Sequence, residues 1–116
     1  MLALERLTTD VLVGTVSNMR AVRLARTRIT YSETAFAELV LWRVPKPVVG
    51  SAHEFKYRLA YVVDGVCVLR YDNEGGKGDH QHVDGKERTY AFISPDQLIA
   101  DFQREIARWN HENRDS

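Results

Sequence analysis

Two Asp-Gly dipeptides, each lying between short segments of strand-like sequence, constrain the fold of this chain more than any other feature. Asp64-Gly65 separates residues 55–63 from residues 66–73, and Asp84-Gly85 separates HQHV from KERTYAFI. Asp-Gly favours the two-residue type I′ turn, whose twist matches that of paired antiparallel strands. The sequence therefore predicts two successive β-hairpins.

Two further strands are expected upstream of these hairpins. VRLARTRIT alternates apolar residues with arginine, and TAFAELVLWRV is rich in strand-forming residues and is followed by two prolines. Runs such as LVLW and VCVL have little polar interruption, so the central strands are expected to meet apolar groups on both faces, supplied by the N-terminal segment or by a partner. The prediction is a twisted, mainly antiparallel sheet of five or six strands.

A helix is expected at the C-terminal end. Ser94 suits the N-cap, Pro95 suits the first helical position, and Gln97 completes a capping box. Apolar residues then recur at helical spacing, at Leu98, Ile99, Phe102, Ile106 and Trp109. Packing this helix on one face of the sheet gives an α+β fold. We expect a single domain over residues 21–116 and an appendage over residues 1–20 that is either a short helix or disordered.

Composition limits the partners that the chain can attract. Its 116 residues include sixteen basic and sixteen acidic side chains. Zero net charge argues against indiscriminate attraction to nucleic acid, so RNA binding requires a local patch. Five arginines against two acidic residues before residue 32 supply one candidate, and an ordinary solvated edge is the simpler explanation for them.

The apolar composition points to the cytoplasm. No apolar run approaches the roughly 18 residues of a membrane span, so no membrane association is expected. The single cysteine, Cys67, excludes a disulfide scaffold and is expected to be a buried, inert thiol.

Polar residues gather where the first hairpin opens. With regular pairing from the Asp64-Gly65 turn, Arg58 lies opposite Tyr71 and Leu59 lies opposite Arg70. Because side chains alternate between faces, one face is predicted to carry Lys56, Arg58, Tyr71 and Asn73, and the other Tyr57, Arg70 and Asp72. Each arginine either grips a phosphate with two parallel hydrogen bonds or pairs with a carboxylate such as Asp72, Asp79 or Glu74.

The segment EGGKGD leaves the same end of the hairpin and holds three glycines among six residues. Glycine lets backbone N–H groups approach an anion, and Lys77 adds a point charge beside them. A plain mobile turn is the alternative. Trp42, at the end of its strand, either stacks on a base or contacts the core or a partner.

His80 and His82 are two residues apart in a predicted strand, so both imidazoles are expected on one face. The second hairpin places Thr89 opposite His80 and Glu87 opposite His82. In the first interpretation, one histidine takes the proton of an RNA 2′-hydroxyl and another group protonates the departing 5′ oxygen, while Lys77 and an arginine stabilise the phosphorane.

Two other interpretations of this histidine pair stay open. Asp79, His80 and His82 are a ligand set that suits a divalent metal, provided that the loop bends to bring Asp79 round. Alternatively, both rings are structural and are satisfied by hydrogen bonds at a strand edge. His53, in the loop before KYRL, is a reserve candidate for the site.

The order of these motifs resembles the TumE-like toxins of bacterial toxin-antitoxin modules. The resemblance covers residues 27–109 and is strongest in AELVLWRVP, KYRL and the LRYDN...GKGDHxH segment; residues 1–20 carry none of it. It implies a ribonuclease-type toxin held silent by a cognate DNA-binding antitoxin. RNA is then the substrate, a homodimer is left open, and no cofactor is expected.

The resulting hypothesis is a toxin that cleaves RNA by metal-independent acid-base chemistry. His80, His82 and Lys77 are the predicted catalytic residues. The predicted substrate-binding residues are Lys56, Arg58, Arg70, Tyr71, Asp72 and Asn73, with Asp72 and Asn73 also shaping the loop. The alternative is a non-catalytic module of a toxin-antitoxin complex that binds nucleic acid or a partner protein.

Overall fold

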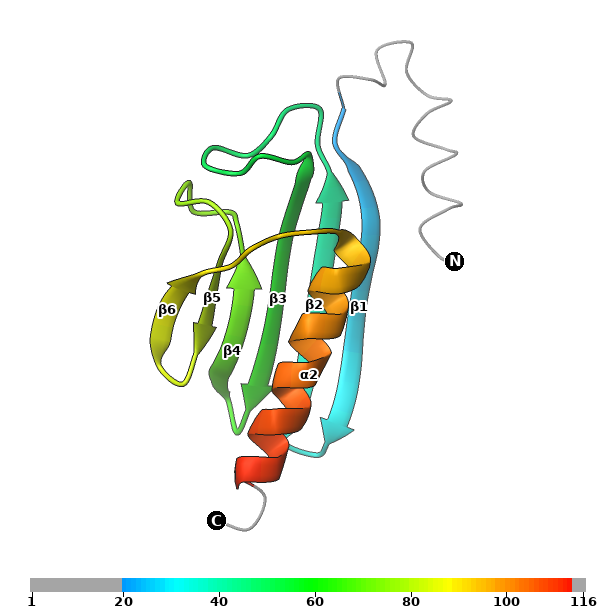
Figure 1. The fold of residues 1–116 in the computed structure, drawn as a ribbon. Helices are drawn as coiled ribbons and strands as arrows, with labels where there is room; N and C mark the ends of the chain where they lie inside the picture. The colour runs from blue at the N-terminus through cyan, green and yellow to red at the C-terminus, as the bar shows by residue number, and fades with distance from the viewer. Residues whose placement is uncertain (1–19, 114–116) are drawn as a thin grey trace.

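The computed structural model describes residues 20–113, which form one six-stranded antiparallel sheet and one helix (Figure 1). The strands neighbour one another in chain order: β1 (Val22–Ser32), β2 (Ala35–Arg43), β3 (Phe55–Val63), β4 (Val66–Asp72), β5 (His80–Val83) and β6 (Lys86–Thr89). Helix α2 (Pro95–Asn113) follows the last strand. The predicted α+β fold is confirmed. The predicted appendage falls on residues 1–20, of which 1–19 lie outside the described part of the chain.

Both predicted hairpin turns are present. Asp64 and Gly65 have φ angles of 52° and 78°, and Asp84 and Gly85 have φ angles of 56° and 76°. Positive φ at both central residues is the requirement of the type I′ turn, which glycine meets without strain. These turns set β3 against β4 and β5 against β6.

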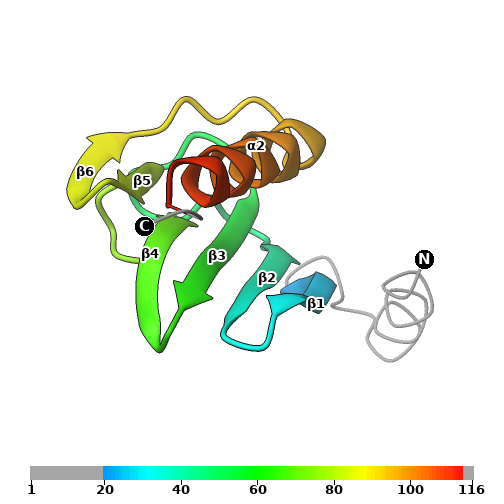
Figure 2. The ribbon, with the colours of Figure 1, turned by 90° about the horizontal axis from the view of Figure 1, so that it is seen from below.

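Helix α2 lies across one face of the sheet, as Figure 2 shows from its end. Its N-cap is as predicted, because the Gln97 N–H donates to Ser94 Oγ at 3.1 Å. The reciprocal half of the capping box is absent, since the Gln97 amide donates to Asp101 instead. Leu98, Phe102 and Ile106 are at most 1% exposed and form the buried stripe of the helix. Within residues 20–113, no helix has the length and hydropathy to cross a membrane.

One face of the sheet is covered by α2 and the other is not. The face under α2 carries the core, with Leu39, Leu59, Tyr61 and Tyr71 buried there. We call the opposite side the open face, because no helix or strand of residues 20–113 lies over it (Figure 2). The sequence predicted that residues 1–20 or a partner chain would contact this second face with apolar groups. Residues 1–19 lie outside the described part of the chain, so that contact stays a prediction.

A β-bulge in β4 changes the register of the first hairpin. Tyr61 pairs with Leu69 but Val62 pairs with Cys67, so Val68 is an extra residue in β4. Because each residue of slip moves a side chain to the other face, the regular register that we predicted is wrong beyond the bulge. Arg58 lies opposite Asp72, and Leu59 lies opposite Tyr71.

The bulge also corrects the predicted division of polar residues between faces. Tyr71 joins Tyr57 on the helix-covered face, where both are at most 2% exposed. Arg70 and Asp72 join Arg58 and Lys56 on the open face. The polar cluster that the sequence divided between two faces is therefore gathered on one.

Cys67 is exposed, so the predicted buried thiol is wrong. The residue lies only two positions beyond Gly65 and next to the bulge, where the hairpin end has few neighbours to cover it.

The packing of α2 predicts a specific stability change. Phe102 is fully buried, and its ring meets that of Tyr71 edge to face at a centroid distance of 5.6 Å. Phe102→Ala should lower the free energy of unfolding by about 3–5 kcal/mol, measured by urea denaturation, because it removes a large side chain and leaves a cavity. Gln103→Ala, at the exposed neighbouring position, should change it by less than about 0.5 kcal/mol. Equal effects in the two variants would show that α2 is not anchored on this face.

Candidate functional site

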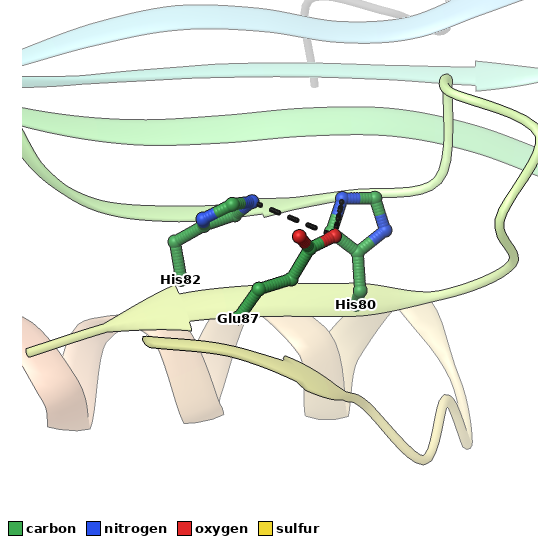
Figure 3. Close-up of side chains that lie close together, drawn as sticks. All are labelled: His80, His82 and Glu87. Carbon is green, nitrogen blue, oxygen red and sulfur yellow. Dashed lines mark ion pairs between the residues drawn. The ribbon is translucent and has the colours of Figure 1, made fainter. Parts of the chain in front are cut away.

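Three neighbouring strands bring the predicted histidines together with carboxylates and an arginine on the open face. Across β4, β5 and β6, Asp72 pairs with His80, and Arg70, His82 and Glu87 pair in the next row. In Figure 3 the side chains of His80, His82 and Glu87 rise from the sheet on the side away from α2 and converge. The predicted pairing of Glu87 with His82 and the shared face of the two histidines are confirmed.

His80 is held by acceptor oxygens at both ring nitrogens. Its Nδ1 lies 3.0 Å from the Gly78 carbonyl oxygen, and its Nε2 lies 3.0 Å from Asp72 Oδ1 and 3.4 Å from Glu87 Oε2. A carbonyl oxygen only accepts hydrogen bonds, so Nδ1 donates to Gly78, whereas Nε2 is in charge contact with the two carboxylates. The residue is only 6% exposed.

His82, by contrast, is bound by a hydrogen-bond donor. Arg70 Nη2 lies 2.7 Å from His82 Nε2. A guanidinium carries only donors, so this nitrogen accepts and the ring proton sits on Nδ1. Glu87 Oε2 is 3.8 Å from the same atom, too far to compete with the arginine. Burial and the charge of Arg70 both lower the pKa of His82, and only part of this is offset by Glu87.

Glu87 and Lys77 complete the cluster at its exposed edge. Lys77 Nζ lies 2.8 Å from Glu87 Oε2, the oxygen that also faces both histidines. Lys77 keeps the pKa of Glu87 below its ordinary range, first through this hydrogen bond. The glycine loop therefore delivers Lys77 to the histidine pair as predicted, with Glu87 as the contact between them.

Two glycines support this site by a close backbone contact. A Cβ atom added to Gly78 would lie 2.8 Å from the Gly50 carbonyl oxygen, and one added to Gly50 would lie 2.5 Å from the Gly78 nitrogen. Both residues also have positive φ. Side chains are therefore excluded at both positions. This contact fixes the Gly78 carbonyl that binds His80, so Gly78 acts in packing rather than as part of an open anion-binding loop.

Asn73 also shapes this end of the sheet. It is fully buried, its Oδ1 accepts from the Tyr57 N–H at 3.0 Å, and its Nδ2 donates to the Phe55 carbonyl oxygen and to Ser51 Oγ. These bonds tie the start of the glycine loop to β3 and to the loop before it. The predicted loop-shaping role of Asn73 agrees with this geometry, whereas its burial leaves no surface for a substrate.

Other predicted residues lie apart from the cluster. Tyr71 packs under α2 with its pKa raised to about 12, mainly by burial. Asp79 accepts hydrogen bonds from His53 Nε2 at 2.8 Å and from the Tyr57 hydroxyl at 2.6 Å. His53 also stacks on Phe92, with ring centroids 3.7 Å apart. Asp79 and His53 thus belong to a structural cluster on the helix side, and neither takes part in the histidine site.

The predicted metal ligand set changes accordingly. His80, His82 and Glu87 each offer a ligand atom within 4.8 Å of the others, so Glu87 takes the place that the sequence gave to Asp79. Two cationic groups already contact these atoms, Arg70 at His82 and Lys77 at Glu87. A divalent ion here would sit beside two positive charges, which weakens its binding.

Sequence reasoning missed the two contacts that define the histidines, namely Asp72 with His80 and Arg70 with His82. Both come from the β4–β5 register, which was not predicted from the sequence, and the bulge at Val68 places them on the face that carries Arg58 and Lys56. Nothing in the run VCVL marks the bulge. Of the remaining predicted residues, Arg58 and Lys56 lie on the open face in β3, with exposed side chains.

The fold and site define an α+β protein whose open sheet face carries a histidine pair bound by carboxylates and cationic side chains. Comparison with protein families gives a match to the family described as Toxin TumE over residues 3–110, and the chain belongs to that family. The match starts at residue 3, so the statement that residues 1–20 carry no resemblance was wrong. No curated protein and no solved structure matches the chain.

The geometry predicts how the pKa of His82 responds to its two charged neighbours. By NMR titration of the ring Cε1–H signal, the pKa of His82 should lie below 6.5. Arg70→Leu should raise it, since a repelling charge is removed, and Glu87→Gln should lower it further, since an attracting charge is removed. The signal of His111, at the exposed end of α2, is the internal reference. A wild-type value above 6.5 would mean that His82 is paired as a cation with Glu87.

Proposed function

We propose that this toxin cleaves single-stranded RNA by metal-independent acid-base chemistry at His80 and His82. A toxin of the TumE family implies a cognate antitoxin, and silencing by that partner is part of the proposal. The observation that carries the proposal is the pair of opposite hydrogen-bond patterns: His82 Nε2 accepts from Arg70, whereas both nitrogens of His80 face acceptors.

Opposite protonation forms are what this reaction needs at neutral pH. A neutral imidazole can take a proton and an imidazolium can give one, and the two rings lie with their centroids 5.4 Å apart. His82 is therefore assigned as the base and His80 as the acid.

In the proposed reaction the phosphoryl group moves from the 5′ oxygen to the 2′ oxygen of the RNA. His82 Nε2 removes the 2′-hydroxyl proton, the 2′ oxygen forms a bond to phosphorus, and the bond from phosphorus to the 5′ oxygen breaks. His80 Nε2 gives its proton to that departing oxygen. The products are a 2′,3′-cyclic phosphate and a 5′-hydroxyl, and proton exchange with water restores the two histidines.

Arg70 couples substrate binding to the exposure of the base. In the free protein its guanidinium occupies the lone pair of His82 Nε2 and also pairs with Asp72, Nε to Oδ2, at 2.9 Å. This contact with Asp72 is an ion pair of poor hydrogen-bond geometry, and the Arg70 Nε–H is the one buried side-chain group within residues 20–113 that makes no well-aligned hydrogen bond. A phosphate offers that donor an acceptor, and movement of Arg70 towards it would free the nitrogen of His82. Lys77 would then stabilise phosphorane charge from the other side.

One observation favours the alternative, a non-catalytic module that binds nucleic acid or a partner. His80 is almost fully buried, its Nδ1 is hydrogen-bonded to the Gly78 carbonyl, and its Nε2 is in charge contact with Asp72. These properties are typical of a structural histidine. The two functions make different predictions for variants that keep the fold.

The catalytic proposal predicts the effect of removing the base alone. His82→Gln keeps an acceptor for Arg70 but cannot take a proton near neutral pH, so RNA cleavage should fall at least about 100-fold. His111→Ala, at the exposed end of α2, should retain wild-type cleavage. Both are assayed on a defined RNA with a chelator present, after circular dichroism has shown that they fold.

The pH profile of cleavage adds a second readout. Because the pKa of His82 is lowered, the base stays neutral down to pH values below 6.5, and activity on the acid side should be lost only there. Full cleavage by His82→Gln would remove His82 from the mechanism. Loss of wild-type cleavage on chelation would replace the proposal with a metal-dependent one.

A further inference from the structure

A basic patch occupies the open face of β1, β2 and β3, beside the histidine site. Val40 of β2 pairs with Arg26 on one side and Arg58 on the other, and Trp42 pairs in the same way with Arg23 and Lys56. Paired residues point to the same side of a sheet, so two cations flank Trp42 and two more flank Val40 in the next row of the same face. We call Arg23, Arg26, Trp42, Lys56 and Arg58 the basic patch.

Among residues 20–113, these four cations lack the ion-pair partners that Arg28, Arg70 and Lys77 of the same face possess. Within strands β1 to β6 this face carries three carboxylates, and each is already paired: Glu38 with Arg28, Asp72 with Arg70 and His80, and Glu87 with Lys77. Within residues 20–113, no ion pair joins a carboxylate to any cation of the basic patch. Although the chain has zero net charge, these four positive charges without ion-pair partners among residues 20–113 lie together on the open face.

Like charges gathered without counterions repel one another, and an anionic ligand relieves that repulsion. The arginines of β1 and β3 are two strand spacings apart, about 10 Å, so one phosphate cannot satisfy both sides. A chain of phosphates can. Trp42 lies between the two sides, where a base can stack on its ring.

We propose that the basic patch binds the backbone of single-stranded RNA and leads the strand into the histidine site. This inference rests on the proposed function for its substrate class and adds a binding site on β1 and β2. The patch is continuous with the site, because Arg58 pairs with Asp72, which contacts both His80 and Arg70. A single strand is favoured over a duplex because its unpaired bases are free to stack on Trp42.

The test measures binding separately from cleavage. A fluorescein-labelled, single-stranded 2′-O-methyl oligonucleotide cannot be cleaved through its 2′ oxygen, so anisotropy with the full chain reports binding alone. Arg26→Ala/Arg58→Ala should weaken binding roughly tenfold at about 0.1 M salt, and should reduce the slope of log K against log salt by about 1.4. His111→Ala, at the exposed end of α2, should bind as tightly as the wild type.

A matched control removes the same charge from the opposite side of the sheet. Lys86 and Arg88 pair with Val83 and Gln81 in the rows of the helix-covered face, and both are exposed. Lys86→Ala/Arg88→Ala should change the affinity less than twofold. Equal weakening by both double variants would show only a general effect of net charge and would overturn the patch.

Trp42 gives a second, independent signal. RNA binding should quench tryptophan fluorescence, and Trp42→Leu should abolish the quenching, leaving the emission of Trp109 unchanged on titration, and weaken binding at least about fivefold. Binding of a duplex or of poly-glutamate as tight as that of the single strand would overturn the proposal in favour of duplex or acidic-protein recognition. Unaltered binding by Arg26→Ala/Arg58→Ala would overturn it even if His82→Gln abolishes cleavage, so the two proposals fail separately.

Discussion

The bulge at Val68 is the constraint on which both the core and the site depend. One extra residue in β4 sends Tyr71 under α2 and turns Arg70 and Asp72 to the open face. In a regular register the charged pair would face the apolar stripe of α2 and the tyrosine would face outwards. Taking both charges of this ion pair out of water would cost several kcal/mol in desolvation, so the bulged register is strongly preferred. The same slip therefore completes the core and places Arg70 and Asp72 of the candidate site on the open face.

Once assembled, the site is defined by which atoms can donate and which can accept. Arg70 carries only donors, and the Gly78 carbonyl carries only acceptors, so the contacts of His82 and His80 are not interchangeable. Two histidines separated by one residue on one strand thus acquire different roles from their neighbours on adjacent strands. Asp72 links the two, since it contacts both His80 and Arg70.

The sequence predicted the local features well because their signals are local. Asp-Gly turns fix positive φ, Ser94 caps α2, and the second hairpin brings Glu87 opposite His82 without any irregularity. The bulge was missed because VCVL fits a strand in either register. The contact between Gly50 and Gly78 could not be predicted from the sequence either, because it joins two loops that approach each other only in the folded sheet. Asp79 was misplaced for the same reason, because its partner His53 lies in a distant loop.

The chemical identity of the RNA ends tests the central claim most directly. Cleavage of a defined single-stranded RNA by the purified protein, with a chelator present, should leave a 2′,3′-cyclic phosphate and a 5′-hydroxyl. A substrate with a single 2′-deoxy sugar at the cleaved position should resist. These results would follow from attack by the 2′ oxygen under acid-base catalysis at His82 and His80. Products that carry a 5′-phosphate and a 3′-hydroxyl, or cleavage of the deoxy substrate, would contradict the account, because they require water rather than the RNA itself as the nucleophile.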